Sequence, residues 1–161
     1  ARHLRETEPP DELWVEETLL ETLRLLAPVA QPRRSRATGR HERLVRDVRE
    51  ILSSRFEQPW TVSSIAKVVG ASSFHACRVF RRSTGYSLHA YLTEQRLRRS
   101  LVLLGEGRMG LRAVASTLGF SSHSHFTAAF RRAFGIAPSE FRAGATASQA
   151  RDLAARLVRR A

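Results

Sequence analysis

The chain has 161 residues, with 27 lysines and arginines against 15 acids, a formal net charge of +12 and a pI near 11.6. A chain of this length can bury a core, but it holds one or two small domains rather than a large one. Its one cysteine excludes an internal disulfide framework and a cysteine-based zinc cluster, and it favours a reducing, cytoplasmic compartment. No apolar run approaches the roughly 18 residues of a membrane span, so we expect no membrane as a partner.

The positive charge is concentrated after residue 21. Residues 1–21 hold seven acids and two arginines, whereas the other 140 residues hold 25 basic residues and eight acids. Lys67 is the only lysine, so nearly every positive charge is a guanidinium, which suits phosphate or guanine recognition. A genome that favours arginine codons would explain why arginine is used instead of lysine. It would not explain why basic residues outnumber acidic ones. The charge therefore favours nucleic acid as the partner.

Residues 11–26, DELWVEETLLETLRLL, are predicted to form an amphipathic helix. Acids lie near its start and Arg24 lies near its end, as the helix dipole favours. This stripe is expected to dimerise, to dock on a preceding domain, or to pack on the next helix. The chain begins with Ala rather than Met, so we expect it to be the C-terminal portion of a longer protein. The apolar stripe is expected to contain Leu13, Trp14, Leu19, Leu20, Leu23 and Leu26.

A linker and a second helix follow. Pro28 ends the first helix, and residues 28–40 have the Pro, Ser, Gly and Arg content of an exposed linker, where we place the domain boundary. A second helix is predicted from about residue 42 to residue 56, before Pro59 and Trp60 break the pattern. Its inward side chains are predicted to be Leu44, Val45, Val48, Ile51, Leu52 and Phe56.

From residue 61 onward the sequence repeats itself. The first copy contains IAKVVGASSFHACRVFRRSTGYSLHAYL, and the second contains VASTLGFSSHSHFTAAFRRAFGIAPSEF. Matching positions lie 49 residues apart up to the paired serines and 50 apart from Phe80 on, so we expect one additional residue in the second long helix. Between the copies, residues 87–104 predict one helix with Arg96, Arg98 and Arg99 on its outside.

Each copy has the spacing of a helix-turn-helix. A short helix carries Ala and then Gly four residues later, as in Ala66 and Gly70, and a serine precedes a longer helix. Glycine takes the left-handed conformation past a helix end, and serine supplies an N-cap oxygen. In such a unit the second helix enters the DNA major groove. Two units in register predict an all-α protein, with subdomains over residues 41–86 and 105–146, a linker helix over 87–104, and a basic tail over 147–161.

The second long helix carries short polar groups where a surface helix normally carries long charged ones, which would let its backbone approach the bases. Arg78 suits guanine O6 and N7, and Phe74 suits a thymine methyl group. Predicted base-reading residues are Ser73, Phe74, Cys77, Arg78, Ser122, His123, Ser124, His125, Thr127 and Ala128. Predicted phosphate contacts are Arg81, Arg82, Ser87, Arg131, Arg132 and Ser139. Predicted core aromatic residues are Phe80, Phe126, Phe130, Phe134 and Phe141.

The linker helix sets the predicted size of the DNA site. Its 18 residues would span about 27 Å at the standard rise, so helices held at its ends could reach successive major grooves about 34 Å apart. One chain would then cover on the order of 20 base pairs. Because the two copies differ, each half is expected to read a different sequence, and the promoter site is expected to be asymmetric.

Residues 41–142 resemble the DNA-binding domain of the AraC/XylS family of bacterial transcription regulators. The most specific part is GFSSHSHFTAAFRRAFGIAPSEFR, which is similar to the family signature from its Gly-Phe-Ser-Ser start to its aromatic-Arg end. The segment RLRRSLVLL of the linker helix also fits. The resemblance implies seven helices in two homeodomain-like helix-turn-helix subdomains, promoter DNA as the partner, and activation through RNA polymerase at the nucleoid.

The sequence departs from the family pattern at two positions. Ala128 stands where members often have a long polar or basic residue, which weakens direct base readout by the second half. Ser100 stands where Ala is usual in the linker helix, a small change. Most members place an effector or dimerisation domain first, and residues 1–27 resemble the end of such a domain. A homodimer would then form through this helix or through a preceding domain.

Other functional classes fit the sequence less well. His123 and His125 point about 200° apart on a helix, so they cannot chelate one metal together. No nucleophile and base pair, carboxylate dyad or phosphate loop is evident, so we predict no enzyme, catalytic residue, metal or cofactor. The alternative function is a nonspecific architectural DNA-binding protein, which the charge allows but the short, uncharged second reading face disfavours.

Overall fold

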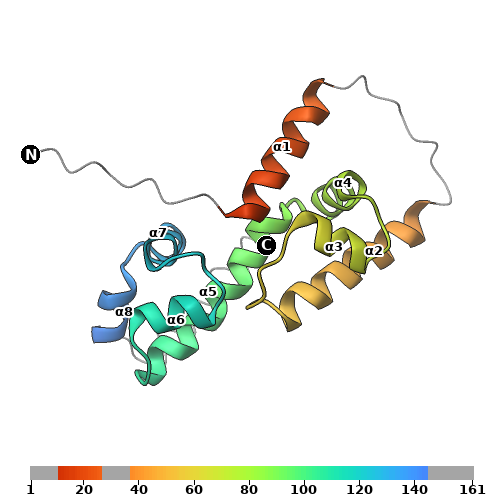
Figure 1. Ribbon diagram of the computed structural model, residues 1–161. Helices are drawn as coiled ribbons and strands as arrows, with labels where there is room; N and C mark the ends of the chain where they lie inside the picture. Colours follow the sequence, from red (N-terminus) through yellow and green to blue (C-terminus); the bar gives the residue numbers. More distant parts are fainter. Residues whose placement is uncertain (1–10, 27–36, 145–161) are drawn as a thin grey trace, which may run out of the picture.

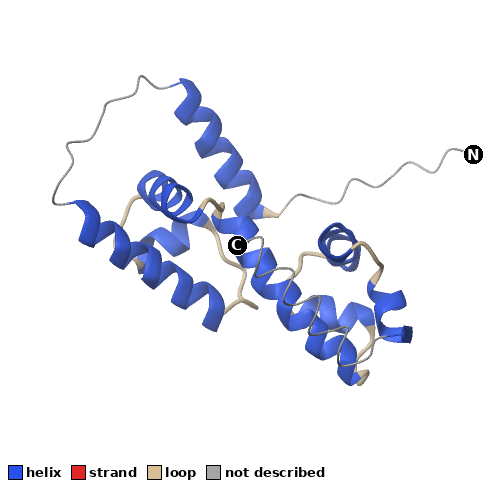
Figure 2. Ribbon diagram, turned by 180° about the vertical axis from the view of Figure 1, so that it is seen from behind, coloured by secondary structure: helices blue, strands red, loops and turns tan. Residues whose placement is uncertain are grey.

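The computed structural model describes residues 11–26 and 37–144, and each regular element within them is an α-helix (Figures 1 and 2). The predicted all-α class is confirmed. No helix in this part of the chain combines the length and apolarity that a membrane span requires. Residues 28–36 of the expected linker and the tail over 147–161 lie outside the described residues. The helices are α1 Glu12–Leu26, α2 Ala37–Ser54, α3 Val62–Val68, α4 Ser73–Thr84, α5 Leu88–Glu106, α6 Leu111–Thr117, α7 His123–Phe134 and α8 Pro138–Gly144.

Within residues 37–144, α2, α3 and α4 form one subdomain and α6, α7 and α8 form another, with α5 between them (Figure 1). The start of α5 places Leu88 and Leu92 in the first core, and its second half places Leu97, Leu101 and Leu104 in the second. The linker helix therefore belongs to both cores. All five phenylalanines predicted as core are buried: Phe80, Phe126, Phe130, Phe134 and Phe141.

The helix before the repeat begins earlier than predicted. α2 starts at Ala37 and ends at Ser54, so residues 37–40 are helical rather than part of the linker. The chain turns after Ser54, and Pro59 disfavours helical backbone at Gln58, so the helix does not resume there. The indole Nε1 of Trp60 then donates to the carbonyl oxygen of Arg55 (2.8 Å) and closes the turn. The predicted inward face of this helix is confirmed, with Leu44, Val45, Val48 and Leu52 buried and Ile51 and Phe56 partly buried.

The two helix-turn-helix units differ in their turns, not in their long helices. Both α4 and α7 have 12 residues, with serine N-caps at Ser72 and Ser122 and glycine C-caps at Gly85 and Gly135. The caps are 50 residues apart, whereas α3 and α6 are 49 apart. The prediction of an additional residue inside the second long helix is therefore wrong: Ser121, in the turn, is the additional residue.

Arg96 is buried, although the sequence placed it on the outside of the linker helix. Its side chain is 3% exposed, and it donates from Nε to the carbonyl oxygen of Phe56 (2.8 Å) and from Nη2 to that of Gln58 (2.9 Å). Its guanidinium carbon also lies 5.7 Å from the centroid of the Phe120 ring. Burial lowers the pKa of Arg96 to about 10, with Asp11 opposing the shift, so the group stays charged at neutral pH. Arg96 thus joins the first subdomain's loop to the second subdomain's turn.

Gly119 allows the close approach that Arg96 bridges. Its φ of +76° ends α6 in the left-handed conformation, which glycine adopts without a Cβ penalty. A Cβ at this position would collide with the carbonyl oxygen of Glu57 and would lie 2.9 Å from Arg96 Nη2. The backbone of the second turn therefore packs directly on the loop of the first subdomain.

α1 packs on the first subdomain with a different face from the one predicted. Leu13 is completely buried in the first core, but Trp14 is 49% exposed and Leu19 is 59% exposed. Glu17 is buried instead, because its carboxylate accepts backbone hydrogen bonds from another helix. The predicted single apolar stripe is therefore wrong for Trp14 and Leu19.

The close packing at Gly119 predicts that alanine destabilises the protein more at Gly119, after α6, than at Gly70, the equivalent position after α3. Gly119→Ala should lower the free energy of unfolding by at least about 2 kcal/mol more than Gly70→Ala, because only the first adds overpacking. Gly70 has a φ of +65° and no atom within 4 Å of the place that a Cβ would take, so its change carries only the left-handed cost of about 1–2 kcal/mol. Urea unfolding measures both values. Equal losses would contradict the close contact.

Candidate nucleic-acid interface

The long helix of the first helix-turn-helix unit, α4, is the predicted first reading helix, and it presents an aromatic ring paired with a guanidinium. Its N-cap Ser72 accepts from the backbone N–H of His75 (3.3 Å). Phe74 is 39% exposed, Arg78 is partly exposed, and the guanidinium carbon of Arg78 lies 5.7 Å from the Phe74 ring centroid. A cation over an aromatic face is held by the ring quadrupole. The pair therefore presents one flat, cationic surface, and Ser73 lies partly buried at the start of the same helix.

Cys77 does not lie on an open groove face. The side chain is 5% exposed and belongs to the first core cluster. Burial, together with the nearby carboxylates of Glu17 and Glu21, raises the pKa of the Cys77 thiol to about 12. Cys77, predicted to read bases, is therefore a buried thiol of the first core, with acids of α1 nearby.

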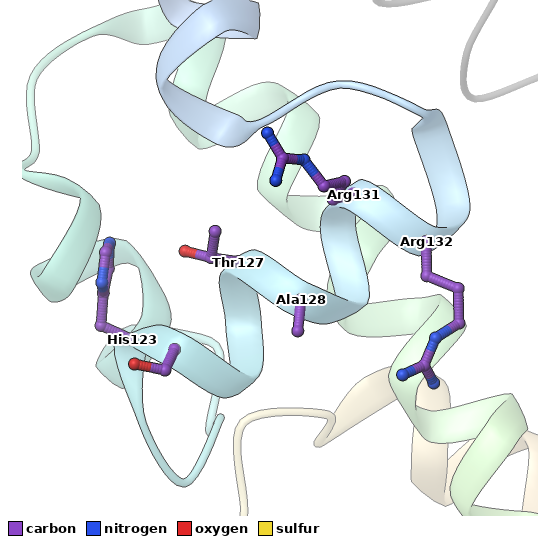
Figure 3. A pocket seen from close by; sticks show the side chains of 6 residues that line it. His123, Thr127, Ala128, Arg131 and Arg132 are labelled. Carbon is purple, nitrogen blue, oxygen red and sulfur yellow. The ribbon is translucent and has the colours of Figure 1, made fainter. Parts of the chain in front are cut away.

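The second reading helix, α7, carries an open hollow of about 620 Å³. In Figure 3 its lining side chains project from one helix, with His123 toward one end and the two arginines toward the other. Ala128, in the middle, adds no bulk, so the helix backbone lies close to the surface of the hollow. The structure brings together six predicted contact residues here: His123, Ser124, Thr127, Ala128, Arg131 and Arg132.

Thr127 carries an unsatisfied polar atom in this hollow. Its Oγ1 is buried and has no hydrogen-bond partner within the described part of the chain. A buried hydroxyl without a partner costs about 1–3 kcal/mol, so a rotation that brings it to a ligand would recover that energy. Thr127 occupies the same place on α7 that Cys77 occupies on α4, 50 residues earlier.

His125 and Ser122, both predicted to read bases, make contacts within the protein. The His125 ring stacks on His89 of α5, with centroids 6.3 Å apart and an interplanar angle of 7°. The same ring meets Phe120 edge-on, and its Nδ1 lies 3.0 Å from Ser121 Oγ. Ser122 is the N-cap, accepting from the backbone N–H of His125 (2.9 Å). His125 therefore faces the linker helix rather than the hollow.

Five of the six predicted phosphate contacts are exposed, and Ser87 is the exception. Ser87 is partly buried and is the N-cap of α5, where it accepts from the backbone N–H of Ala90 (3.1 Å). Arg81 is exposed, and its Nη1 lies 3.4 Å from Glu21 Oε1 of α1. The other exposed members are Arg82, Arg131, Arg132 and Ser139.

Sequence reasoning missed His89 and the inward acids of α1. His89 is an isolated histidine in a helix, and only the fold brings it beneath His125. Its pKa is lowered by burial, and Arg96 and Arg132 add to the shift while Asp11 opposes it. The acids of α1 were visible as a charge cluster, but their spacing alone did not indicate which face would turn inward.

The chain is similar to known regulatory proteins over about three fifths of its length. The model of a helix-turn-helix domain family matches residues 65–144. The Msm operon regulatory protein of Streptococcus mutans serotype c is 33% identical over 98 residues, which cover 61% of this chain and 35% of that protein. This chain thus spans about a third of that relative's length.

Two solved structures are similar in fold and sequence. A probable AraC family transcriptional regulator from Rhodopseudomonas palustris is 33% identical with a TM-score of 0.58, over 62% of this chain and 94% of that one. The DNA-binding domain of AdpA, a global transcriptional factor solved with a target DNA, is 30% identical with a TM-score of 0.56, over 63% of this chain and 90% of that one. These proteins are regulators or DNA-binding domains rather than enzymes.

The partly buried His89 predicts a pH dependence of stability. The pKa of His89 is lower in the folded chain than its ordinary value of 6.5. Just below pH 6.5, His89 therefore binds a proton more readily in the unfolded chain than in the folded one. The free energy of unfolding should therefore fall as the pH is lowered from 8 to 5. His75, whose pKa burial also lowers, should contribute in the same direction.

Urea unfolding at several pH values checks this expectation. His89→Gln should show a smaller loss than the unmodified chain, and a double change with His75→Gln should show the smallest loss of the three. Identical pH profiles for the unmodified chain and His89→Gln would contradict a buried, neutral His89.

Proposed function

The chain belongs to the AraC family of helix-turn-helix transcription regulators, and we propose that it binds one asymmetric promoter site of about 20 base pairs with α4 and α7 in successive major grooves. The observation that carries this proposal is the pair of equivalent, similarly capped helices on either side of α5. α5 has 19 residues and so is about 28 Å long, close to the groove repeat of about 34 Å.

The two halves would read DNA differently. On α4, Arg78 held over Phe74 supplies a bidentate donor for guanine and an apolar ring for a thymine methyl group. On α7, Ser124 and Ala128 stand at the positions of Phe74 and Arg78, so this half offers short side chains and a close backbone. We expect the first half-site to carry the stronger base preference.

The exposed arginines would supply affinity and register. Arg82, Arg131 and Arg132 lie in the later turns of α4 and α7, beyond the residues that reach bases. Guanidinium contacts with phosphates carry no sequence information but release counterions, so binding should weaken steeply with salt. Ser139 on α8 is a further candidate phosphate contact.

For the whole protein we propose an activator that contacts RNA polymerase at promoters in the cytoplasm. The support is the family membership and the signature segment over residues 119–142. A homodimer formed through α1 or through a preceding domain is part of the same proposal. It is supported by the exposed Trp14 and Leu19 of α1.

A nonspecific architectural role is the second candidate, favoured by the net charge of +12. Selection of random 30-base-pair duplexes by the full chain, at near-physiological salt, separates the two. The proposal expects two different motifs about one helical turn apart, bound about 10³-fold or more tightly than scrambled DNA. Sequence-blind binding that is lost with salt would contradict it and would favour the architectural role.

Arg78 gives the sharpest test of base reading. Arg78→Ala should weaken binding to the selected duplex by about 1–3 kcal/mol, or roughly 5- to 150-fold, and should relax preference within one half-site. Arg46→Ala is the charge-matched control, because Arg46 is exposed on α2 and pairs with Asp47 (3.7 Å). Fluorescence anisotropy with selected and scrambled duplexes measures both changes. Equal weakening by both variants on both duplexes would remove Arg78 from base readout.

A further inference from the structure

The carboxylate of Glu17 in α1 occupies the N-terminus of the linker helix. Its Oε1 accepts from the backbone N–H of Leu88 (2.7 Å), and its Oε2 accepts from that of His89 (3.0 Å). Glu17 is 5% exposed, so this anion is held away from water. Free N–H groups and the helix dipole make a helix N-terminus a favourable place for any anion, a carboxylate or a phosphate alike.

Two further acids of α1, and Asp11 directly before it, contact residues of the first helix-turn-helix subdomain and of α5. Glu21 Oε1 lies 3.4 Å from Nη1 of Arg81, a candidate phosphate contact on α4. Glu16 Oε2 accepts from the backbone N–H of Val62 (2.6 Å), and Asp11 Oδ2 lies 3.9 Å from Arg96 Nη1. α1 is therefore bound by charge complementarity along its length, in addition to the burial of Leu13.

α1 also covers one side of the first reading helix. Cys77 is buried on α4, and the carboxylates of Glu17, Glu21 and Glu16 add to burial in raising the pKa of its thiol. Arg81, one turn later on α4, lies 3.4 Å from Glu21. Leu13 belongs to the same core cluster as Cys77. In Figure 1, α1 leaves the side of α5 and extends past α4.

We propose that α1 and duplex DNA compete for the first subdomain, so that α1 is an autoinhibitory cover which DNA must displace. The major groove is about 12 Å wide and admits one α-helix, whose diameter with side chains is about 10–12 Å. A second helix packed on the flank of α4 would meet the walls of the groove. The carboxylate at Arg81 would also occupy a place that a phosphate takes.

This inference rests on the proposed function, and it adds a regulated state in which α1 covers the first subdomain. Only the fraction of molecules with α1 released would bind DNA, so the apparent dissociation constant is the intrinsic one divided by that fraction. Any change that releases α1 should tighten binding to every duplex that α4 contacts. It should also expose Cys77, the only cysteine of the chain.

A charge-neutral pair of variants in the full chain tests the competition. Leu13→Ala removes the buried anchor of α1, whereas Val102→Ala shortens an apolar side chain that is 47% exposed on α5 and has no proposed role in binding. The rate of Cys77 alkylation in the free protein reports the release of α1. Fluorescence anisotropy reports affinity for the selected and scrambled 30-base-pair duplexes. Leu13→Ala should raise both the alkylation rate and the duplex affinity by at least about threefold, and Val102→Ala should change neither.

A second pair keeps the test decisive if Leu13→Ala loses helical circular dichroism. Glu17→Gln weakens the anchor at α5, and Glu12→Gln makes the same charge change at an exposed position in the first turn of α1. Glu17→Gln should tighten duplex binding at least about threefold more than Glu12→Gln, again with faster alkylation of Cys77. If the two variants changed duplex affinity equally, the loss of one negative charge would explain the result. The proposed competition between α1 and DNA would then be overturned.

The outcomes separate the competition from the proposed function. Faster alkylation with unchanged or weaker duplex affinity would show that α1 does not block DNA. Unchanged alkylation in both Leu13→Ala and Glu17→Gln would show that α1 does not cover Cys77 in solution. Either result would overturn the competition between α1 and DNA. A preference for the selected duplex over the scrambled one would still support the proposed function. Tighter binding to selected and scrambled duplexes alike, with no preference between them, would instead support the competition and contradict sequence-specific regulation.

Discussion

The burial of Arg96 is the interaction on which the arrangement of the two reading helices depends. Removing a guanidinium from water costs several kcal/mol unless its donors are satisfied. Here the carbonyl oxygens of Phe56 and Gln58 accept from it, and the ring of Phe120 lies against it. Those partners belong to opposite subdomains, so a rotation of one subdomain about α5 would leave a buried charge uncompensated. Gly119 lets the two backbones approach closely enough for one side chain to reach both.

This constraint gives a physical reason for a single DNA site of fixed geometry. α4 and α7 are positioned by caps of the same kind, and each packs on a core that includes part of α5. Their outer faces nevertheless differ, with Phe74 and Arg78 on one and Ser124 and Ala128 on the other. The repeat therefore duplicates the position of a helix without duplicating the side chains on its outer face. The proposed control by α1 acts on the same first subdomain for which we propose the stronger base preference.

Local patterns predicted most of the fold. The helices, the repeat and the phenylalanine core follow from apolar periodicity and cap residues, which act over a few positions. Arg96 was misplaced because an arginine beside Arg98 and Arg99 has the pattern of a solvated face, and its carbonyl partners lie 38 and 40 residues away without any side-chain signal. The additional residue was misplaced because Ser121 and Ser122 both match a capping serine, and only backbone geometry selects the N-cap.

The candidate site was predicted less completely, for a related reason. The six residues around the hollow on α7 share one helix, so their spacing places them together. Cys77 and His125 have equally suitable spacing, but the first is buried in the first core and His89 of α5 stacks on the second. Those contacts arise between distant segments and are decided by packing. The inward turn of the α1 acids likewise depends on helix N-termini and an arginine that lie far away in the sequence.

The most direct test of this account is affinity for duplexes that hold the two selected half-sites at different spacings. With α4 and α7 fixed by Arg96, each added base pair rotates one half-site by about 35° around the DNA axis and carries it out of reach. The account predicts a sharp optimum, with a loss of at least about tenfold for one or two added base pairs. Affinity that stays flat across zero to about five added base pairs would contradict a rigid two-groove reader.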